Sequence, residues 1–522
     1  MYRRAWFRLI QPRVDLREAP PQRRVTGAWV EPVAKDRSLL GVSTVSFLGE
    51  TRDVANARCW NDPSSGKLWL YNLHYFDDLS GSSTPQQRKL QEDFTLRWIA
   101  ENPPALGCGW DPYPTSLRIV NWIKRGRAES AIPGIEMQSL AVQCRWLAKR
   151  VEHHLLANHL FVNGKALVFG GLFFDGPEAD QWLDQGLGIL KQEIPEQILS
   201  DGGHFERSPM YHAIVLEDLL DLINASNGWH GRIPEAIVEG WKDSARAMLD
   251  WLSRMVHPDG EFAFFNDCAF AIAPTLAQLR AYATRLGFSS SAPALASINQ
   301  IGSSGYARAE SGSAVLIADV APIGPEYQPG HAHADTLSFE LSIHGCRVLV
   351  NSGTSTYAIG SQRAHERSTR AHNTVEIDGC DSSEVWGGFR VARRAHVISS
   401  SFAETDGSIV ITGAHDGYRR LRGRPVHLRE WRLSANRLVI VDSISGRFTT
   451  AVARLYLHPS IVQVGPHAVR LPTGEQLLFA VHGGCLNIET ASWHPQFGLA
   501  QANLCVVLRM SESTMTTELQ WV

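Results

Sequence analysis

Residues 330–354 read GHAHADTLSFELSIHGCRVLVNSGT, and one run inside this stretch changes the periodicity of the whole chain. Its apolar residues occupy every second position, at Leu337, Phe339, Leu341 and Ile343. Polar residues, Ser338, Glu340 and Ser342, fill the alternate positions. A period of two predicts an antiparallel strand at 337–343, with one face buried and the other in water.

Similar runs continue from this stretch to the end of the chain, separated by Gly, Asp, Asn and Ser. They predict strands at 313–320, 346–352, 395–402, 408–415, 426–434, 437–445, 450–458, 476–483 and 504–510. Many short antiparallel strands in succession favour a large β-sandwich.

Upstream of residue 300 the apolar residues recur at helical spacing instead, with short breaks that contain Gly, Pro and Asp. The expected helices surround 86–101, 115–125, 134–156, 158–172, 209–224, 234–256 and 275–286. Helices followed by strands indicate an α+β multidomain chain rather than a doubly wound sheet. We expect an irregular N-terminal arm at 1–80, a helical domain at 81–300 and a sheet domain at 301–522.

The charge and cysteine content exclude several functional classes. The 522 residues carry a formal net charge of −3, so the chain is not a polycation built for nucleic acid. Eight cysteines are scattered without a CxxC pair, which fits reduced and mostly buried thiols. No apolar segment follows the charged start MYRRAWFRLI, and none is long enough to span a membrane. We therefore expect a cytoplasmic protein without membrane insertion.

The segment DGGHFERSPMYHAIVLEDLL at 201–220 carries a candidate catalytic tyrosine. Ser208 is a good N-cap and Pro209 suits the first helical position, which places Tyr211 in the first turn. The helix N-terminus and a nearby cation would both lower the pKa of the phenol, as a general base requires. An arbitrary tyrosine is more often a core residue with one hydrogen bond.

Histidines and asparagines supply the other candidates. His331 and His333 are separated by one residue, and His372 precedes an apparent strand, which is a plausible pattern for metal ligands. The alternative is that these histidines bind backbone carbonyls. Asn158 begins an apolar helix, where an N-cap is the simpler interpretation.

Basic residues cluster at Arg363, Arg367 and Arg370 and again at Arg390, Arg393 and Arg394. They suit either an acidic-polymer site or a solvated surface.

Taken in order, these segments resemble the heparinase II/III family of polysaccharide lyases. The motifs are YPTSLRIVNW at 113–122, NHL–N–AL at 158–167, DGG–FE–SP–YH at 201–212, HAHAD–LSFEL–G–LVNSGT at 331–354, and R–HNTVEIDG followed by VWGGFR at 370–390. They cover roughly residues 105 to 390, and the ordered set is far more specific than any one motif. Asn158 stands where other branches can carry His, which favours the heparinase III branch.

The resemblance implies an incomplete (α/α) toroid followed by an antiparallel β-sandwich, and a lyase that acts on a uronate-containing acidic polysaccharide. Tyr211 would take the C5 proton, with His331 as the catalytic histidine and Asn158 as a ligand of the uronate carboxylate. Different tasks for His331 and His333 require a bent loop, because in a straight strand both would point the same way.

Further residues follow from the same motifs. Substrate binding would involve His212, Glu206, Arg207 and Arg367. One structural divalent metal, zinc or calcium, would be held by His333, His372 and Asn351, and no organic cofactor is implied. Asn351 stands where the family has Asp, so it offers a neutral carbonyl oxygen in place of a carboxylate.

Two other functions stay open from the residues alone. A glycoside hydrolase on an α/α toroid needs two carboxylates flanking the bond, and Glu206 and Asp267 are candidates. A non-catalytic protein on the same fold, which binds glycan or takes part in polysaccharide biosynthesis, would bind without turnover.

Overall fold

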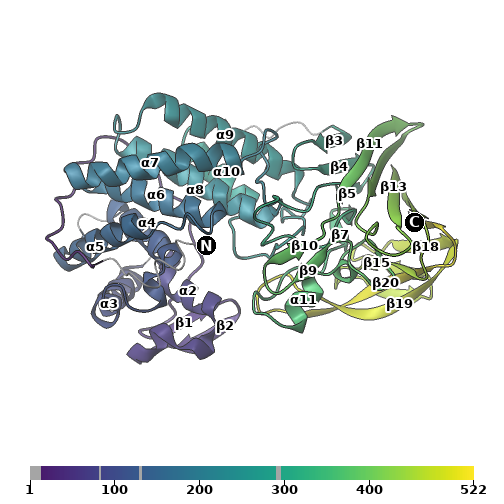
Figure 1. The fold of residues 1–522 in the computed structure, drawn as a ribbon, viewed down its shortest axis with the longest axis horizontal. Helices are drawn as coiled ribbons and strands as arrows, with labels where there is room; N and C mark the ends of the chain where they lie inside the picture. Colours follow the sequence, from purple (N-terminus) through teal and green to yellow (C-terminus); the bar gives the residue numbers. More distant parts are fainter. Residues whose placement is uncertain (1–12, 81–83, 129–131, 290–295) are drawn as a thin grey trace. The chain divides into compact units, whose positions relative to one another are not determined.

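The computed structural model describes residues 13–80, 84–128, 132–289 and 296–522, and the chain forms two compact units. Unit 1 consists of Met1–Gln197, Val215–Arg246 and Gln278–Ser290. Unit 2 consists of Ile198–Ile214, Ala247–Ala277 and Ser291–Val522. The fold class is the predicted one, an incomplete (α/α) toroid followed by an antiparallel β-sandwich (Figure 1).

The helices of the described chain mostly agree with the predicted ranges to within a few residues. They are α2 (Lys67–Tyr75), α3 (Pro85–Glu101), α4 (Pro112–Ala128), α5 (Gly134–Arg150), α6 (Ala157–Phe173), α7 (Pro177–Gln197), α8 (Pro209–Gly228), α9 (Glu235–Arg254), α10 (Leu276–Arg285) and α11 (Ser361–Arg367). Short 3-10 helices are η1 (Ala57–Asn61), η2 (Pro63–Ser65), η3 (Asp77–Ser80), η4 (Cys108–Trp110) and η5 (Thr369–Ala371). Helices α2, α7 and α11 are additional to the predicted ranges.

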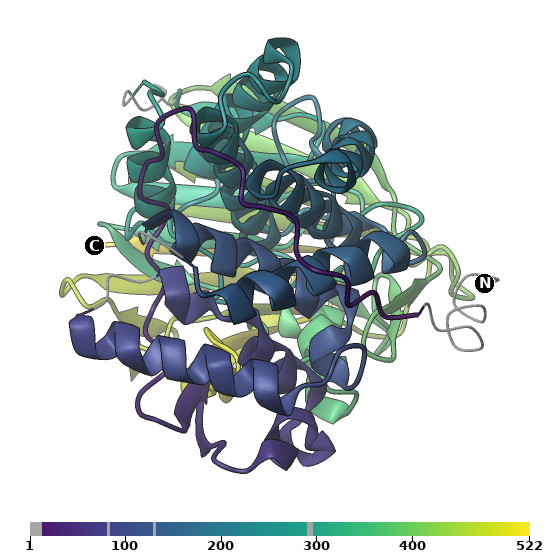
Figure 2. The same ribbon diagram turned by 90° about the vertical axis from the view of Figure 1, so that its left-hand side faces the viewer.

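Unit 1 is held together by an extended segment and by buried charge. Residues 13–38 run across the helices without regular structure, as the dark purple trace in Figure 2 shows. On the inside, Lys165 of α6 lies 2.6 Å from both Asp218 and Asp221 of α8. Lys124 of α4 lies 2.5 Å from Asp221. Because all four side chains are buried, these ion pairs tie three helices together.

All pairs of neighbouring strands among the strands β1–β21 are antiparallel. Unit 2 has sheets in the orders β11-β12-β13-β14-β21-β18-β17-β16, β19-β20-β15-β8, β3-β4-β5-β6-β7 and β10-β9, and unit 1 has β1-β2.

The strands of the first half of this set are β1 (Thr44–Phe47), β2 (Glu50–Asp53), β3 (Ile298–Ile301), β4 (Tyr306–Ser311), β5 (Ala314–Asp319), β6 (Phe339–Ile343), β7 (Cys346–Leu349), β8 (Val375–Ile377), β9 (Glu384–Trp386), β10 (Arg390–Ala392) and β11 (Val397–Thr405). The others are β12 (Ser408–His415), β13 (Val426–Ser434), β14 (Arg437–Ser445), β15 (Ala451–Tyr456), β16 (Val462–Gly465), β17 (Ala468–Arg470), β18 (Gln476–His482), β19 (Gly484–Trp493), β20 (Gln501–Met510) and β21 (Thr514–Trp521).

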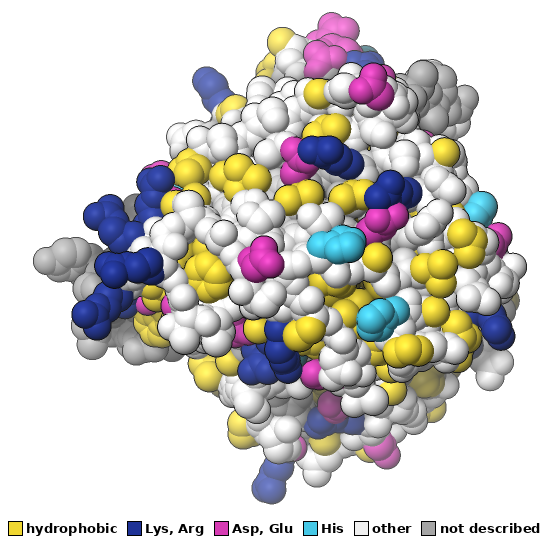
Figure 3. All heavy atoms as spheres, turned by 90° about the vertical axis from the view of Figure 1, so that its right-hand side faces the viewer, with side chains coloured by type: hydrophobic (Ala, Val, Ile, Leu, Met, Phe, Trp, Pro, Cys, Tyr) yellow, Lys and Arg dark blue, Asp and Glu magenta, His cyan; other side chains and the backbone are white. Residues whose placement is uncertain are grey.

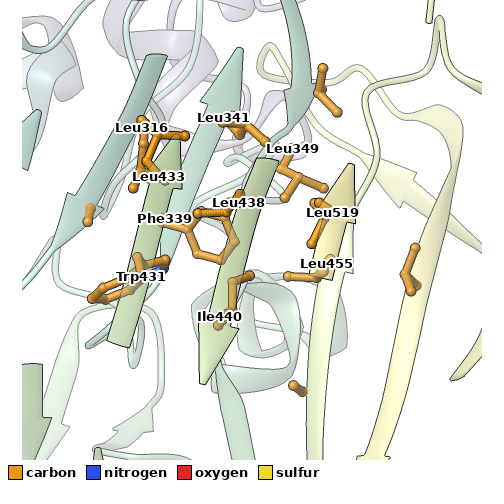
Figure 4. Packing of buried hydrophobic residues seen from close by; sticks show 14 of the residues in the cluster. Leu316, Phe339, Leu341, Leu349, Trp431, Leu433, Leu438, Ile440, Leu455 and Leu519 are labelled. Atoms are coloured by element: carbon orange, nitrogen blue, oxygen red, sulfur yellow. The ribbon is translucent and has the colours of Figure 1, made fainter. Parts of the chain in front are cut away.

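The core of unit 2 lies among its three large sheets (Figure 4). Leu341 of β6, Trp431 of β13 and Leu455 of β15 are each at most 1% exposed and belong to one apolar cluster. This core fixes β6 and β7, and through them the loops at 330–338 and 350–360.

The prediction that 337–343 is half-buried was wrong. Both faces of β6 are buried, including Ser338, Glu340 and Ser342. The carboxylate of Glu340 accepts hydrogen bonds from the backbone N–H groups of Phe264 and Asn351 and is bonded to His257. Polar groups of the protein therefore cover the face of β6 that the sequence pattern predicted to be solvent-exposed. A buried carboxylate needs such hydrogen-bond partners.

The cysteines are free, as expected, but the prediction that most are buried was wrong. Cys144, Cys268 and Cys505 are buried, whereas Cys485 is exposed and the remaining four are intermediate. In the described part of the chain, no helix is both long and apolar enough to cross a bilayer. The first twelve residues, on which the expectation about an export signal depends, lie outside the described residues.

Candidate active site

The first turn of α8 places Tyr211, and unit 2 holds that turn in position. The Ser208 hydroxyl accepts a hydrogen bond from the Tyr211 backbone N–H at 3.2 Å, which is the predicted N-cap. The same hydroxyl donates to the Asp267 backbone carbonyl at 2.5 Å. One serine therefore ties the start of the helix to the loop that carries Asp267.

Tyr211 and His331 form a close pair. Their ring centroids are 4.0 Å apart at an interplanar angle of 33°. The Tyr211 hydroxyl lies 3.0 Å from the hydroxyl of Tyr357, so one phenol donates to the other. Glu206 lies on the far side of the imidazole, with Oε2 3.7 Å from His331 Nε2. The His331 side chain is 17% exposed, whereas Tyr211 and Glu206 are buried, so the histidine is the more solvent-accessible member of the pair.

The carboxylate of Asp267 is hydrogen-bonded to four side chains, and one of them is His331. Its Oδ2 is 2.8 Å from His331 Nδ1, and its Oδ1 is 2.8 Å from His333 Nε2. Arg363 donates to both oxygens, to Oδ2 at 2.7 Å. The Thr354 hydroxyl donates to Oδ1 at 3.4 Å. Asp267 is wholly buried, so its charge needs partners within the protein, and these groups supply them.

The environment fixes the charge of this cluster. Burial raises the pKa of Asp267, but Arg363 and the two histidine hydrogen bonds outweigh it and hold the pKa well below its ordinary value. Burial lowers the pKa of His333 to about 4, with Asp267 opposing the effect. Burial also raises the pKa of Tyr357 well above its usual range. At neutral pH the cluster therefore holds an ionised Asp267, a neutral His333 and an un-ionised Tyr357.

The segment with the two histidines is a bent loop, as predicted. Residues 330–338 contain no strand, and β6 starts only at Phe339. Asn266 accepts a hydrogen bond from the His333 backbone N–H at 3.0 Å and donates to the Arg207 carbonyl at 3.0 Å. Arg367 donates to the carbonyl of Ala332 through Nε and Nη2. Both side chains therefore orient the loop on which His331 lies.

The predicted metal ligands do not form a complete metal site. His333 Nδ1 and His372 Nε2 are 3.2 Å apart, but the Asn351 side chain is engaged elsewhere. Its Nδ2 donates to the Phe264 carbonyl at 2.8 Å and its Oδ1 accepts from the Asn373 N–H at 3.1 Å. Among the described residues, no group of three His, Cys, Asp or Glu could hold a metal ion. These residues do not fit a centre with three protein ligands, and metal binding stays a prediction.

The predicted substrate-binding residues are mostly enclosed. His212 is wholly buried, with one ring nitrogen on the Met248 carbonyl and the other accepting from the His204 N–H. Arg367 is fully buried, and burial lowers its pKa to about 10. Arg207 is 8% exposed, and it donates to the Ser304 carbonyl. Glu206 approaches His331, with 3.7 Å between its Oε2 and the imidazole Nε2, and the substrate role of each of the four stays a prediction.

Asn158 belongs to unit 1 and is not part of the cluster in unit 2. It is the second residue of α6, whereas Leu156 occupies the N-cap position, so the N-cap interpretation was wrong. Its neighbour His159 is bonded to Glu152 at 3.1 Å and lies against the ring of Tyr113. The role of Asn158 toward a substrate carboxylate stays a prediction from the resemblance.

Three residues of the cluster were missed or misjudged from the sequence. Asp267 was weighed only as a hydrolytic carboxylate, and Arg363 only as part of a basic cluster, yet each is the partner of the other. Tyr357 was not singled out. The short polar pair in FFNDCAF, at 264–270 between apolar residues, was the available signal for a buried charge. Figure 3 shows basic and acidic side chains together on one face of the molecule, in keeping with the small net charge.

Two family models match consecutive parts of the chain. A family model described as Heparinase II/III N-terminus matches residues 137–289, and one described as Heparinase II/III-like, C-terminal, matches residues 293–522. The chain is 24% identical to the heparin-sulfate lyase of Bacteroides stercoris over 241 residues, which cover 42% of this chain and 35% of that protein. The match therefore spans about a third of that relative's length.

Two further similarities are broader. The chain is 27% identical over 377 residues to FtsZ-localized protein C of Caulobacter vibrioides, covering 66% of this chain and 61% of that protein. A crystal structure of heparinase III aligns with a TM-score of 0.69 at 16% identity, covering 91% of this chain and 79% of that chain. At this identity the structural match establishes a shared fold.

Proposed function

The chain belongs to the heparinase II/III-like family, and on that premise we propose that it is a polysaccharide lyase that cleaves a uronic-acid-containing glycan by β-elimination. The observation that carries the proposal is the close packing of Tyr211 and His331, whose ring centroids are 4.0 Å apart. His331 is hydrogen-bonded to the buried and ionised Asp267. Heparin-like glycans and bacterial exopolysaccharides both contain uronates and are the substrate classes to test.

The residues of unit 2 suit each step of an elimination. Tyr211 removes the C5 proton, and the electrons of the C5–H bond form the C4–C5 double bond as the C4–O bond breaks. The same phenol returns the proton to the leaving oxygen. Once Tyr211 is ionised its oxygen can only accept, so the Tyr357 hydroxyl, 3.0 Å away, then donates to it and stabilises the phenolate. No step needs a metal or an organic cofactor.

The growing negative charge on the uronate carboxylate needs a fixed donor. His331 combines partial exposure with an orienting hydrogen bond on Nδ1, so we assign it this task, with the protonated imidazole donating through Nε2. Asn158 is the second proposed donor, on the strength of its place in the family motif alone. Since a β-elimination consumes no water, the product is a 4,5-unsaturated uronate that absorbs in the ultraviolet.

The test is ultraviolet absorbance on mixing the purified protein with heparin, heparan sulfate, hyaluronan, chondroitin and alginate. A rise with one polymer identifies the reaction and the substrate class together. A flat trace with new reducing ends would replace the lyase by a hydrolase. Polymer binding without either signal would support a non-catalytic protein.

Tyr211→Phe is expected to lower kcat by roughly 10²- to 10⁴-fold, the contribution of a general acid–base group, while the polymer still binds. Tyr418→Phe is the matched control, because it also removes a buried phenol hydroxyl of unit 2, one that donates to the Val375 carbonyl. Steady-state rates and polymer binding are measured for both. Activity of Tyr211→Phe close to that of the control would refute the assignment of the base.

The hydrolase alternative finds little support in the geometry of Asp267. A hydrolytic carboxylate must reach the glycosidic bond or a water beside it. Asp267 is wholly buried and both of its oxygens are bound by Arg363 and histidine. It is therefore placed to orient other groups.

A further inference from the structure

We propose that Asp267 is a positioning residue that keeps one proton of His331 on Nδ1. Nε2, which lies 3.7 Å from Glu206, is then the nitrogen that takes up a second proton and donates to the substrate carboxylate. The inference deepens the proposed lyase function and rests on it for its kinetic consequence. Its structural part, the position of one imidazole proton, can be tested without any substrate.

The hydrogen-bond pattern around Asp267 determines the tautomers. Arg363 can only donate, and it contacts both carboxylate oxygens. Both oxygens therefore act as acceptors, and the histidine nitrogens that face them must carry hydrogens. His331 Nδ1 and His333 Nε2 are those nitrogens, each at 2.8 Å.

The same reasoning extends to the neighbouring histidine. With its proton on Nε2, the neutral His333 offers a lone pair at Nδ1, which accepts from His372 Nε2 at 3.2 Å. His372, His333 and Asp267 thus form one directed chain of hydrogen bonds that ends on the carboxylate. His331 donates to the other oxygen of that carboxylate, Oδ2, which His333 does not use.

Arg363 connects this arrangement to the second phenol. Its guanidinium lies 4.9 Å from the centre of the Tyr357 ring, and its Nε donates to the Gly388 carbonyl at 3.1 Å. Tyr357 in turn contacts the Tyr211 hydroxyl. One buried ion pair therefore orients both neighbours of the catalytic phenol, His331 directly and Tyr357 through Arg363.

The kinetic test is Asp267→Asn. The amide has one acceptor oxygen in place of two, so at least one histidine loses its acceptor and the tautomer of His331 is no longer fixed. We expect kcat to fall by roughly 10²- to 10⁴-fold, with KM changed by no more than about threefold, because orientation in the transition state is lost rather than polymer binding.

Asp442→Asn is the matched control, because Asp442 is also buried and also binds one histidine and one arginine, His427 and Arg429, but lies outside the cluster. Its kcat should stay within about threefold of wild type, since none of these residues belongs to the proposed site. Equal losses in Asp267→Asn and Asp442→Asn would assign Asp267 a purely structural role and overturn the proposal. Thermal unfolding of both variants confirms that folded protein is compared.

The spectroscopic test uses ¹⁵N-histidine NMR on the wild-type protein, with His331→Gln to assign the resonance. The expected result is a protonated Nδ1 on His331 that disappears or moves to Nε2 in Asp267→Asn. A wild-type His331 with a bare Nδ1 would overturn the proposal even if Asp267→Asn does not fold. If no polymer is cleaved but the Nδ1 proton is found, the proposed function fails while the positioning by Asp267 stands.

Discussion

Asn351 is the residue at which this chain departs from the pattern expected for a metal site. Its amide uses both kinds of polar atom, since it donates to one backbone carbonyl and accepts from one backbone N–H. A carboxylate at this position would keep the accepting interaction but face the Phe264 carbonyl without a hydrogen. The amide is therefore suited to its surroundings in a way that an acid is not.

We expect Asn351→Asp to be less stable than wild type by about 1–3 kcal/mol in metal-free buffer, the cost of a buried unpaired polar group. Zinc should raise the Tm of this variant, because the new carboxylate would join His333 and His372 as a third ligand. The wild type, measured in parallel, should show the same Tm with EDTA and with zinc. A large fall of the wild-type Tm in EDTA would restore the predicted metal site.

At the level of single residues, the sequence predicted the catalytic candidates but not the side chains that orient them. Tyr211 and His331 could be chosen because their motifs are local. Their common partner Asp267 lies more than fifty residues from either in the chain. The role of Arg363 was equally hard to predict, because a sequence does not distinguish a buried arginine from a surface arginine until its partners are known.

The hairpin of β9 and β10 is the element that exposes aromatic side chains beside the cluster. Trp386 pairs with Arg390 across the hairpin, and the guanidinium lies 5.9 Å from the indole centre. Trp386 is 59% exposed and Phe389 44% exposed. The Phe389 ring is 5.7 Å from that of His331, so the hairpin is continuous with the proposed site.

Trp386→Ala is expected to raise KM by roughly tenfold with kcat within about threefold, because stacking on a sugar ring contributes about 1 kcal/mol or more to binding. Val462→Ala, which shortens a comparably exposed apolar side chain on β16, should leave KM unchanged. Initial rates over a range of polymer concentration separate the two constants. An unchanged KM in Trp386→Ala would exclude the hairpin from polymer binding.

The elements were predictable where one face is apolar and less so where polar residues are buried or where the strand lies at an edge. Helix α8 begins at Pro209, as its capping residues indicate. Strand β19 was missed because it is an edge strand whose side chains alternate between intermediate and exposed. Strand β21 was missed because Thr, Glu and Gln alternate with its buried Met515, Leu519 and Trp521.

The whole molecule contains many histidines that are neutral because they are buried. Burial lowers the pKa of His74 and of His212 to about 3, and it lowers the pKa of His257 and of His427 as well. In the unfolded chain such groups bind protons near pH 6.5. As the pH falls from 7 toward 5, these histidines therefore bind protons in the unfolded state but not in the folded state. The free energy of unfolding decreases over that range.

Buried acids act in the opposite direction, and Asp218, Asp319, Asp335 and Glu340 are among them. Burial raises the pKa of Asp335 and of Glu340 to about 7, so the folded protein holds their protons where the unfolded chain would release them. Because the histidines are more numerous, we expect Tm to fall by about 5 °C or more between pH 7.5 and pH 5.5. Calorimetry at constant ionic strength checks this. A Tm that is flat or rises toward pH 5.5 would contradict it.

The division of the chain into units bears on how such a protein can be recombined. Residues 198–214 and 247–277 belong to unit 2, although they are surrounded in sequence by unit 1. A chimera that joined the helical half of one homologue to the sheet half of another near residue 300 would take Tyr211 and Asp267 from one parent and His331 and Arg363 from the other. Such hybrids inherit a split set of contacts, so functional exchange requires breakpoints that transfer all three segments of unit 2 together.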